Sequence, residues 1–525
     1  MNNSKVLIIV PHEDDEINIA GGTILELKDK VEIKVVYVTN GDLVFNAKNR
    51  FKEAIASLKS LGVPKENIIF LGYSDQSYDK KTHLYNTEDL WTAEKGYNKT
   101  YGIKGVNEWC FQKHGVHNEF KKRNIVKDIK EVILDYMPDE IICVDLDFHP
   151  DHIMTSLCFE KALGEILNEK RNKYNPTVLK TFAYENSYLG KDDFNCINDY
   201  GMFFSVNKNG NLSNNPYYNI SDSINISIGE DSFSKNLFKN KIWKAILKHK
   251  SQVLVNHASK MINSNYVYWK RNTNSLLNKA KVVVSSSKPE FLNDFLICDT
   301  SNVLGGNKNK IVYDKGIWIP EENDTKKEIQ ISFEKKQYIK YIKLYFGLIN
   351  DRFIKRISIT FDNETVEYSL SDELIQKIMI ERNAKTLVIK ILDDKCYNGF
   401  SEIEAVEHEE NYNENFKVII EESWTNNFIV DETKKYKVTT YPQGCDYKVD
   451  TKHLINGEYM DGYLCLNKYS KGYITFINDN KQDVIYINQA KITRKIWIKS
   501  YKIIVKCAEV YQKISRKISY IKNII

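Results

Sequence analysis

Apolar runs of strand length alternate with amphipathic segments over the first 150 residues of the chain. Continuous Val, Ile and Leu runs predict strands buried on both faces over residues 6–10, 31–39, 67–71 and 141–144. Apolar positions at helical spacing predict helices between them, over residues 23–30, 50–61 and 124–136. This alternation predicts an α/β fold, in which the first domain is a doubly wound, mostly parallel, Rossmann-like sheet.

The pattern changes to short alternating segments from about residue 299. Period-two runs predict the strands of a β-sandwich over residues 328–333, 341–346, 354–361, 365–370 and 386–392. We therefore expect four parts: an α/β domain over 1–290, a β-sandwich over 291–410, a small β module over 411–488 and a helical tail over 489–525.

The predicted sandwich resembles discoidin or galactose-binding modules at two stretches. These are Gly-Ile-Trp-Ile-Pro at residues 316–320 and Gly-Phe-Ser-Glu-Ile-Glu at residues 399–404. The resemblance implies a glycan-binding module, and a purely structural sandwich is the alternative.

The tail is predicted to be a basic amphipathic helix. Residues 491–525 contain ten Lys and Arg against one acidic residue, Glu509. One helical stripe is apolar and consists of Ile492, Ile496, Ile503, Cys507, Val510, Ile514, Ile518, Ile521 and Ile525. A helix of this kind can lie on an anionic membrane surface. The alternative is that the stripe docks on the neighbouring domain or on a second copy of the chain.

Composition and charge exclude several classes of partner. The net charge is only +5 over 525 residues, and the basic tail leaves the first 490 residues slightly acidic, so nucleic acid is not expected as the main partner. A GxGxxG motif is absent, which argues against a dinucleotide cofactor. The oligomeric state is left open by the sequence.

Several features favour a cytoplasmic protein, with peripheral contact of the tail at the inner face of the membrane. The nine Cys are scattered without CxxC spacing, which fits a reducing compartment. The first apolar run lacks a preceding basic region and covers only residues 6–10, so it predicts a strand rather than a signal peptide. Uninterrupted apolar stretches near 18 residues are also absent.

Two clusters of His and acidic residues follow predicted buried strands. The first is His-Glu-Asp-Asp-Glu at residues 12–16, and the second is Asp-Phe-His-Pro-Asp-His at residues 147–152. Ligands of open α/β sheets bind at the carboxyl ends of the strands, so both clusters can converge on one site. Four adjacent acidic residues repel one another unless a cation is present, which predicts a metal centre. The alternative is a solvated acidic turn and an unrelated exposed loop.

The residue types suggest a division of roles. His12, Asp15 and His152 would supply three ligands and leave a fourth position for water, the pattern of a catalytic zinc site. Asp14 would be free to act as general base. His149 would donate a proton or a hydrogen bond to the developing oxyanion.

The chain resembles the PIG-L or LmbE-like family of zinc-dependent N-deacetylases over residues 1 to about 275. The resemblance is carried by PHEDDE at 11–16, HPDH at 149–152, RFKE at 50–53, LGYSD at 71–75, TYG at 100–102 and KAILKHKSQ at 244–252. Glu13 departs from the family, which usually has Pro at this position. The added negative charge is expected to lie near the ion without removing a ligand.

The resemblance implies the same ligands, base and oxyanion donor as the spacing suggests, and it adds substrate contacts. Arg50 would hold a substrate hydroxyl or phosphate, with a surface arginine as the alternative. Asp75 would bind substrate or cap a loop, and Tyr101 belongs to a substrate-loop motif. The aromatic residues between 76 and 120 would either stack on sugar rings or form a structural excursion that buries its own side chains.

These observations predict a zinc-dependent hydrolase that removes the N-acetyl group from an N-acetylglucosamine-type sugar, in a glycoconjugate or a cell-surface polysaccharide precursor. One alternative is a glycan-binding protein with an inert catalytic domain. Another is an amide hydrolase of the same fold that acts on a small non-sugar metabolite.

Overall fold

The structure is a computed structural model of the chain. It describes residues 4–76, 83–169, 174–184, 204, 207, 210–212, 215–229, 236–263, 265–303, 311–408, 417–420, 428–429, 435–441, 445–479, 481–487 and 492–524.

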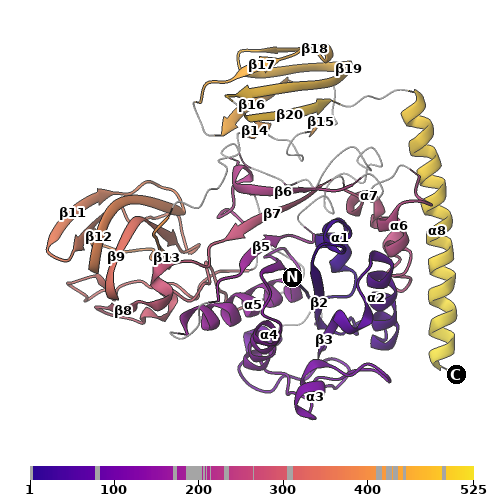
Figure 1. The fold of residues 1–525 in the computed structure, drawn as a ribbon, viewed down its shortest axis with the longest axis horizontal. Helices are drawn as coiled ribbons and strands as arrows, with labels where there is room; N and C mark the ends of the chain where they lie inside the picture. The colour runs from indigo at the N-terminus through magenta and orange to yellow at the C-terminus, as the bar shows by residue number, and fades with distance from the viewer. Residues whose placement is uncertain are drawn as a thin grey trace.

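A seven-stranded sheet forms the centre of the first domain (Figure 1). Its strands are β1 (Lys5–Val10), β2 (Glu32–Thr39), β3 (Ile68–Tyr73), β4 (Glu140–Val144), β5 (Thr177–Thr181), β6 (Ser223–Ser227) and β7 (Asn265–Arg271). They lie in the order β3-β2-β1-β4-β5-β7-β6, in which the first five are parallel to one another, β7 is antiparallel to β5, and β6 is antiparallel to β7. The predicted doubly wound, mostly parallel sheet is confirmed.

The strand order reverses direction between β1 and β4. From β1 the chain winds outward through β2 and β3, and then returns to place β4 on the other side of β1. Open α/β sheets bind ligands at such a switch point, outside the carboxyl ends of the strands. Both predicted His and Asp clusters follow these two strands, so the topology brings them to one place.

Helices cover the sheet on both faces (Figure 1). They are α1 (Asp15–Leu27), α2 (Ala47–Leu61), α3 (Trp109–His114), α4 (Lys122–Tyr136), α5 (Pro150–Asn168), α6 (Lys241–Ile246) and α7 (Ala258–Met261). The helices α1, α2 and α6 pack together on one side, and α4 packs against α5 on the other.

The first helix begins earlier than predicted. Helix α1 starts at Asp15 and passes through Gly21 and Gly22, whereas the sequence predicted a start at residue 23. The two glycines made this stretch resemble a loop, but they serve close packing. A Cβ on Gly22 would lie 2.6 Å from Cε2 of Tyr266 and 2.9 Å from Cγ1 of Ile228.

We expect Gly22→Ala to destabilise the protein by about 1–3 kcal/mol, because overpacking outweighs the gain of about 1 kcal/mol in helix propensity. Gly21→Ala is the matched control, since its Cβ would meet its neighbours at 3.2–3.4 Å in the same helix. Urea unfolding of both variants checks this expectation. Equal stability of the two variants would contradict it.

The aromatic segment between residues 83 and 120 mostly buries its side chains. Tyr85, Trp91 and Trp109 are buried in the core of the first domain. Tyr97 is 45% exposed and stacks on Tyr101 with ring centroids 4.5 Å apart. For the three buried rings the structural alternative is therefore correct.

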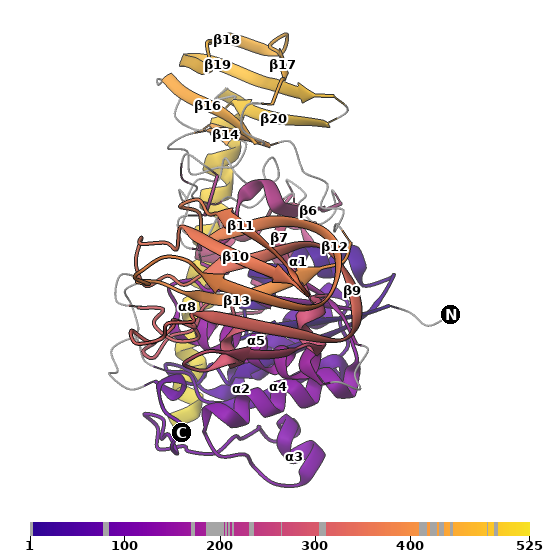
Figure 2. The same cartoon turned by 90° about the vertical axis from the view of Figure 1, so that its left-hand side faces the viewer.

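The second part is an antiparallel sheet of long, bent strands (Figure 2). Its strands are β8 (Lys281–Val284), β9 (Glu328–Phe346), β10 (Arg356–Phe361), β11 (Glu364–Ser369), β12 (Ile375–Ile391) and β13 (Phe400–Val406). Strand β9 unites two segments that were predicted separately. The two stretches that resemble discoidin modules pair with each other beside this sheet. The backbones of Trp318 and Phe400 exchange two hydrogen bonds of 2.9 and 3.1 Å.

The boundary predicted at residue 290 does not separate the two cores. Strand β8 pairs with β9, and Leu277 lies in the second core. Residues Phe295 and Cys298 return to the first core. The backbone N–H of Phe295 also donates a 2.9 Å hydrogen bond to Glu402 of β13. The first two parts therefore interleave over residues 277–303.

The third part is a small β module with its own core. Its strands are β14 (Lys417–Ile420), β15 (Phe428–Ile429), β16 (Lys435–Tyr441), β17 (Lys448–Asp450), β18 (Leu454–Met460), β19 (Tyr463–Asn478) and β20 (Lys481–Ile487). The chain ends in α8 (Ile492–Ile524), a helix that runs down the side of the first domain past α6 and α2 (Figure 1). Within the described residues, none of the helices combines the length and apolar composition needed to cross a bilayer.

Candidate metal centre and active site

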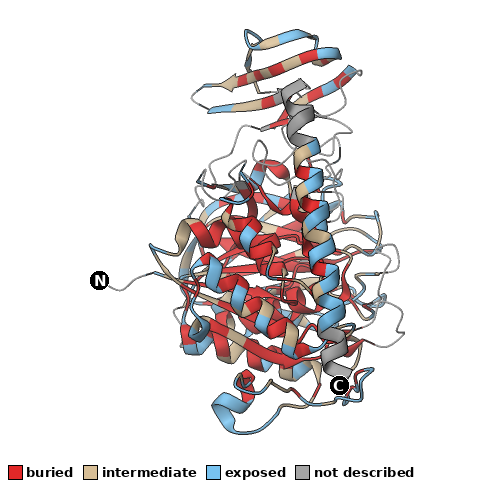
Figure 3. Ribbon diagram, turned by 90° about the vertical axis from the view of Figure 1, so that its right-hand side faces the viewer, coloured by how far each residue is buried: buried red, intermediate tan, exposed pale blue. Residues whose placement is uncertain are grey.

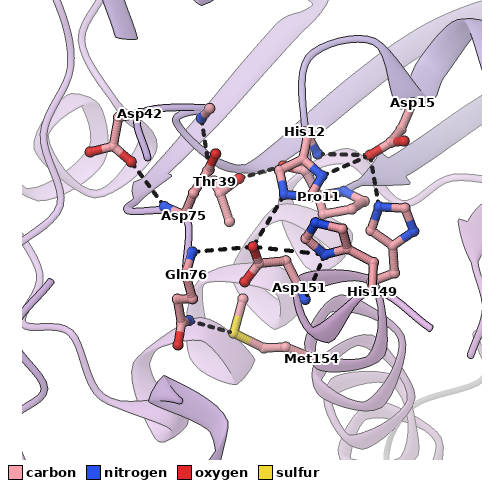
Figure 4. Close-up of polar contacts among 12 residues, drawn as sticks. Pro11, His12, Asp15, Thr39, Asp42, Asp75, Gln76, His149, Asp151 and Met154 are labelled. Atoms are coloured by element: carbon pink, nitrogen blue, oxygen red, sulfur yellow. Dashed lines mark hydrogen bonds and ion pairs between the residues drawn. The ribbon is translucent and has the colours of Figure 1, made fainter. Parts of the chain in front are cut away.

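The two clusters meet at the carboxyl ends of β1 and β4 (Figure 4). Asp15 Oδ2 lies 3.1 Å from His12 Nδ1 and 3.3 Å from His152 Nε2. His12 comes from the loop after β1, Asp15 from the first turn of α1 and His152 from the first turn of α5. The three residues predicted as ligands are therefore brought together, and all three are buried.

The two separations from Asp15 Oδ2 are compatible with a tetrahedral metal ion. Zinc bonds of about 2.0–2.1 Å to nitrogen and oxygen place tetrahedral ligand atoms about 3.3 Å apart, close to both measured separations. His152 Nε2 is buried and, apart from its ion pair with Asp15, has no hydrogen-bond partner among the described residues. Burial would lower the pKa of His152, but the carboxylates of Asp147 and Asp15 raise it to about 9. The same negative field favours a divalent cation.

Two further carboxylates orient the imidazoles. Asp147 Oδ2 lies 2.7 Å from His152 Nδ1, which places the proton on Nδ1 and leaves the Nε2 lone pair for a metal. Asp151 Oδ2 lies 3.2 Å from His12 Nε2, and its other oxygen lies 3.2 Å from His83 Nε2. Burial would raise the pKa of Asp151, but the hydrogen bonds from His12 and His83 hold it well below its usual value.

The contacts of Asp147, Asp151 and His83 in the site were not predicted from the sequence. Asp147 and Asp151 lie within five residues of His152, so the expectation that a ligating imidazole needs a carboxylate partner could have found them. His83 lies far from both clusters in the sequence, and its spacing carries no signal.

His149 caps the start of α5 beside the two ligand imidazoles. Its Nδ1 accepts a 3.2 Å hydrogen bond from the backbone N–H of Asp151. Burial, together with His12 and His152, lowers the pKa of His149 well below its usual value, so the ring is neutral. With the Nδ1 lone pair engaged, the proton of a neutral ring sits on Nε2.

The position of His149 allows two roles. Nitrogen atoms of His12, His149 and His152 lie within 4.8 Å of one another, so the three rings form a buried metal-binding group. A protonated Nε2 is a hydrogen-bond donor and has no lone pair for an ion. The hydrogen bond at Nδ1 therefore favours the predicted donor role over a ligand role.

Asp14 is the most exposed acidic residue of the first cluster, with 15% of its side chain accessible. Its Oδ1 lies 3.3 Å from Arg50 Nη2. Burial raises its pKa, and the Arg50 charge opposes this effect. The backbone has φ 152° and ψ −22°, a conformation that L-residues rarely adopt. Such strain costs about 1–3 kcal/mol and is concentrated at functional sites.

Arg50 is buried between two carboxylates. Its Nε lies 3.3 Å from Glu13 Oε2 and its Nη2 contacts Asp14, while Nη1 is buried without a hydrogen-bond partner among the described residues. Arg50 is thus not the surface arginine of the alternative interpretation. The unusual Glu13 faces this guanidinium, which compensates the added negative charge.

The other two residues predicted to bind substrate lie at different depths. A carboxylate oxygen of Asp75 lies within 4.8 Å of a ring nitrogen of His12 and of a carboxylate oxygen of Asp151. Asp75 also accepts a 2.8 Å hydrogen bond from the Gly41 N–H. Burial and nearby carboxylates raise its pKa to about 6. The hydroxyl of Tyr101 donates a 2.5 Å hydrogen bond to Asp42, which places this ring at the outer loop after β2.

The motif at residues 244–252 forms hydrogen bonds to helices α1 and α2. His249 Nε2 lies 3.0 Å from Glu16 Oε1 on α1. The backbone N–H and hydroxyl of Ser251 donate hydrogen bonds of 2.9 and 2.6 Å to Glu53 on α2. The motif therefore has a structural role away from the metal centre.

A buried His and Asp centre at the switch point of a Rossmann-like sheet is an arrangement that suits a metal-dependent hydrolase. Residues 7–163 match the family model PIG-L, described as GlcNAc-PI de-N-acetylase, so this part of the chain belongs to the PIG-L deacetylase family. No curated protein matched the chain.

Solved structures resemble the first two parts of the chain. An N,N'-diacetylchitobiose deacetylase from Pyrococcus horikoshii is 18% identical over 51% of this chain and 84% of its own, with a TM-score of 0.28. The deacetylase of the A40926 pseudoaglycone is 14% identical over 52% of this chain and 100% of its own, with a TM-score of 0.28. A family 32 carbohydrate-binding module from C. perfringens, solved with galactose, is 11% identical over 24% of this chain and 92% of its own, with a TM-score of 0.17. These likenesses concern the fold alone.

Proposed function

We propose that the first domain is a zinc-dependent deacetylase that removes the N-acetyl group from an N-acetylglucosamine-type sugar, in a glycoconjugate or a cell-surface polysaccharide precursor. The observation that supports it most is the position of Asp15 Oδ2 between His12 Nδ1 and His152 Nε2. The family model that matches this domain describes deacetylation of a glucosamine compound, which favours a sugar substrate.

His12, Asp15 and His152 would hold the ion. A zinc ion there would supply Lewis acidity, which polarises the amide carbonyl and acidifies the attacking water. Asp14 then accepts the proton of that water, helped by the raised pKa of its carboxyl group, and passes it to the leaving amine. His149 donates its Nε2 proton in a hydrogen bond to the charge that develops on the amide oxygen.

Arg50 and Asp75 would hold the sugar. Arg50 keeps Asp14 in place through Nη2 and has an additional donor, Nη1, for a hydroxyl or phosphate oxygen. Asp75 lies beside His12 and can accept hydrogen bonds from sugar hydroxyls. Tyr101, fixed by its hydrogen bond to Asp42, would contact the substrate farther from the reacting bond.

A screen of N-acetylhexosamine conjugates for released acetate tests the proposal, with N-acetylated amino acids and amines as the non-sugar panel. We expect release from the sugar panel by the parent protein and much less by Asp14→Asn. Release from the non-sugar panel alone would favour a hydrolase of small metabolites. Failure to release acetate from either panel by metal-loaded protein would favour the inert glycan-binding alternative.

A further inference from the structure

Helix α8 has two different apolar faces, of which one is docked on the first domain. Tyr501 and Val505 are buried in the first core. Gln512 is fully buried, accepts a 3.4 Å hydrogen bond from the Val255 N–H and donates one of 3.4 Å to the Ile246 carbonyl. Spacings of four and seven residues place these three side chains on one face.

The stripe predicted from the sequence lies on the other face and is exposed. Among its described members, the exposed fraction is 64% for Ile503, 48% for Val510, 53% for Ile514 and 49% for Ile518. Cys507 is exposed as well. Figure 3 shows this outward side of α8 coloured as exposed. The side chains of Ile492, Ile496, Ile521 and Ile525 lie outside the described residues. Docking on the first domain therefore leaves the stripe uncovered.

Basic residues border the exposed stripe. The spacing of these residues along the helix places them in one row, at one side of the exposed stripe. The row consists of Lys499, Lys502, Lys506, Lys513 and Lys517, all of which are exposed. The one acidic residue of the segment, Glu509, already binds Lys506 at 3.0 Å and also binds Lys513. A continuous apolar face beside a row of cations matches a surface that is both apolar and anionic.

Helix α8 contacts the loop between β2 and α2. The Arg516 guanidinium lies 4.6 Å from the ring centroid of Phe45, in the loop that follows β2. In the same loop, Asp42 accepts hydrogen bonds from the Asp75 N–H at 2.9 Å and from the Tyr101 hydroxyl. Helix α8 therefore contacts a loop that also binds Asp75, a residue beside His12 of the metal centre.

We propose that the exposed face of α8 lies on an anionic lipid bilayer, with Ile503, Val510, Ile514 and Ile518 in the interface and the lysines at the headgroups. A second copy that packs its own α8 against this face fits less well, because it would add a further row of lysines, and its one acidic residue in this segment, Glu509, already binds Lys506 and Lys513.

Co-sedimentation with vesicles tests the proposal on the full chain. We expect the protein to pellet with vesicles of phosphatidylcholine mixed with phosphatidylglycerol, and not with phosphatidylcholine alone. Each engaged basic side chain strengthens binding about fivefold, so high salt should release the protein. Point variants are preferable to deletion of α8, because deletion would uncover the core around Tyr501 and Val505.

The double variant Val510→Glu and Ile514→Glu is expected to bind anionic vesicles at least about tenfold more weakly, because it places charges in the apolar interface. The matched control is Met379→Glu with Met460→Glu, which changes two exposed apolar side chains of the β modules by the same charge. Equal loss in both double variants, or equal binding to neutral and anionic vesicles, would overturn the proposal. A dimer that dissociates in the α8 variant, without vesicle binding by the parent, would assign the stripe to self-association instead.

Discussion

Asp14→Asn is expected to lower the rate of amide hydrolysis by about 10²- to 10⁴-fold while leaving the metal content unchanged. Asp14 directly precedes the proposed ligand Asp15 in the chain, its Oδ1 contacts Arg50 Nη2 at 3.3 Å, and its side chain is 15% accessible. Asparagine has the same shape and keeps a side-chain oxygen that can accept the hydrogen bond from Arg50 Nη2, so the loop should persist. The amide cannot accept the proton of water, and this loss accounts for the expected effect.

The control for this experiment is Asp14→Gly. Glycine removes the base and also relieves the backbone strain at φ 152°, so its melting temperature should equal or exceed that of the parent. Low activity in both variants together with undiminished thermal stability would assign the effect to chemistry. Near-parental activity of Asp14→Asn would show that another group is the base.

The local sequence was sufficient to predict the strands β1 to β4 and the position of the site, whereas β5, β6 and β7 were not predicted. Buried strands and the clusters that follow them are contiguous in the chain, and the topology of parallel sheets brings strand ends together. The roles of His83 and Asp42 could not be predicted, because these residues come from separate loops and act through hydrogen bonds formed only in the folded chain.

The predicted helices and strands differ from those of the structure where contacts distant in the sequence decide the local conformation. Gly22 resembled a loop residue, although its small size is what allows Tyr266 of β7 to approach helix α1. In β9 the exposed polar residues 334–336 resembled a turn, but they lie within the strand at a register shift, where the pairing with β12 passes from Ser332 to Gln337. Helix α8 has apolar residues on two faces, one with Tyr501 and one with Ile503. The sequence pattern does not show which face docks on the first domain, and in the structure Tyr501 is buried and Ile503 is exposed.

Metal analysis of four variants is expected to divide the site into ligands and non-ligands. The parent should bind about one divalent ion per chain, as a single three-ligand site requires. We expect each ligand variant, His12→Gln, His152→Gln or Asp15→Asn, to lose most of the ion. Each variant removes one of the three proposed ligand atoms, which are His12 Nδ1, His152 Nε2 and Asp15 Oδ2. Inductively coupled plasma mass spectrometry after gel filtration measures this content.

His149→Gln is the decisive comparison, since it makes the same imidazole-to-amide change inside the same buried group of histidines. We expect this variant to retain the ion and to lose about 10²- to 10³-fold in activity, because His149 uses Nδ1 to accept the Asp151 N–H and presents Nε2 as a donor. Circular dichroism should give the same spectrum for all four variants, so that metal loss reflects the ligand set rather than unfolding. If His149→Gln loses the ion and Asp15→Asn keeps it, the centre is a three-histidine site, and the carboxylate of Asp15 serves to orient His12 and His152.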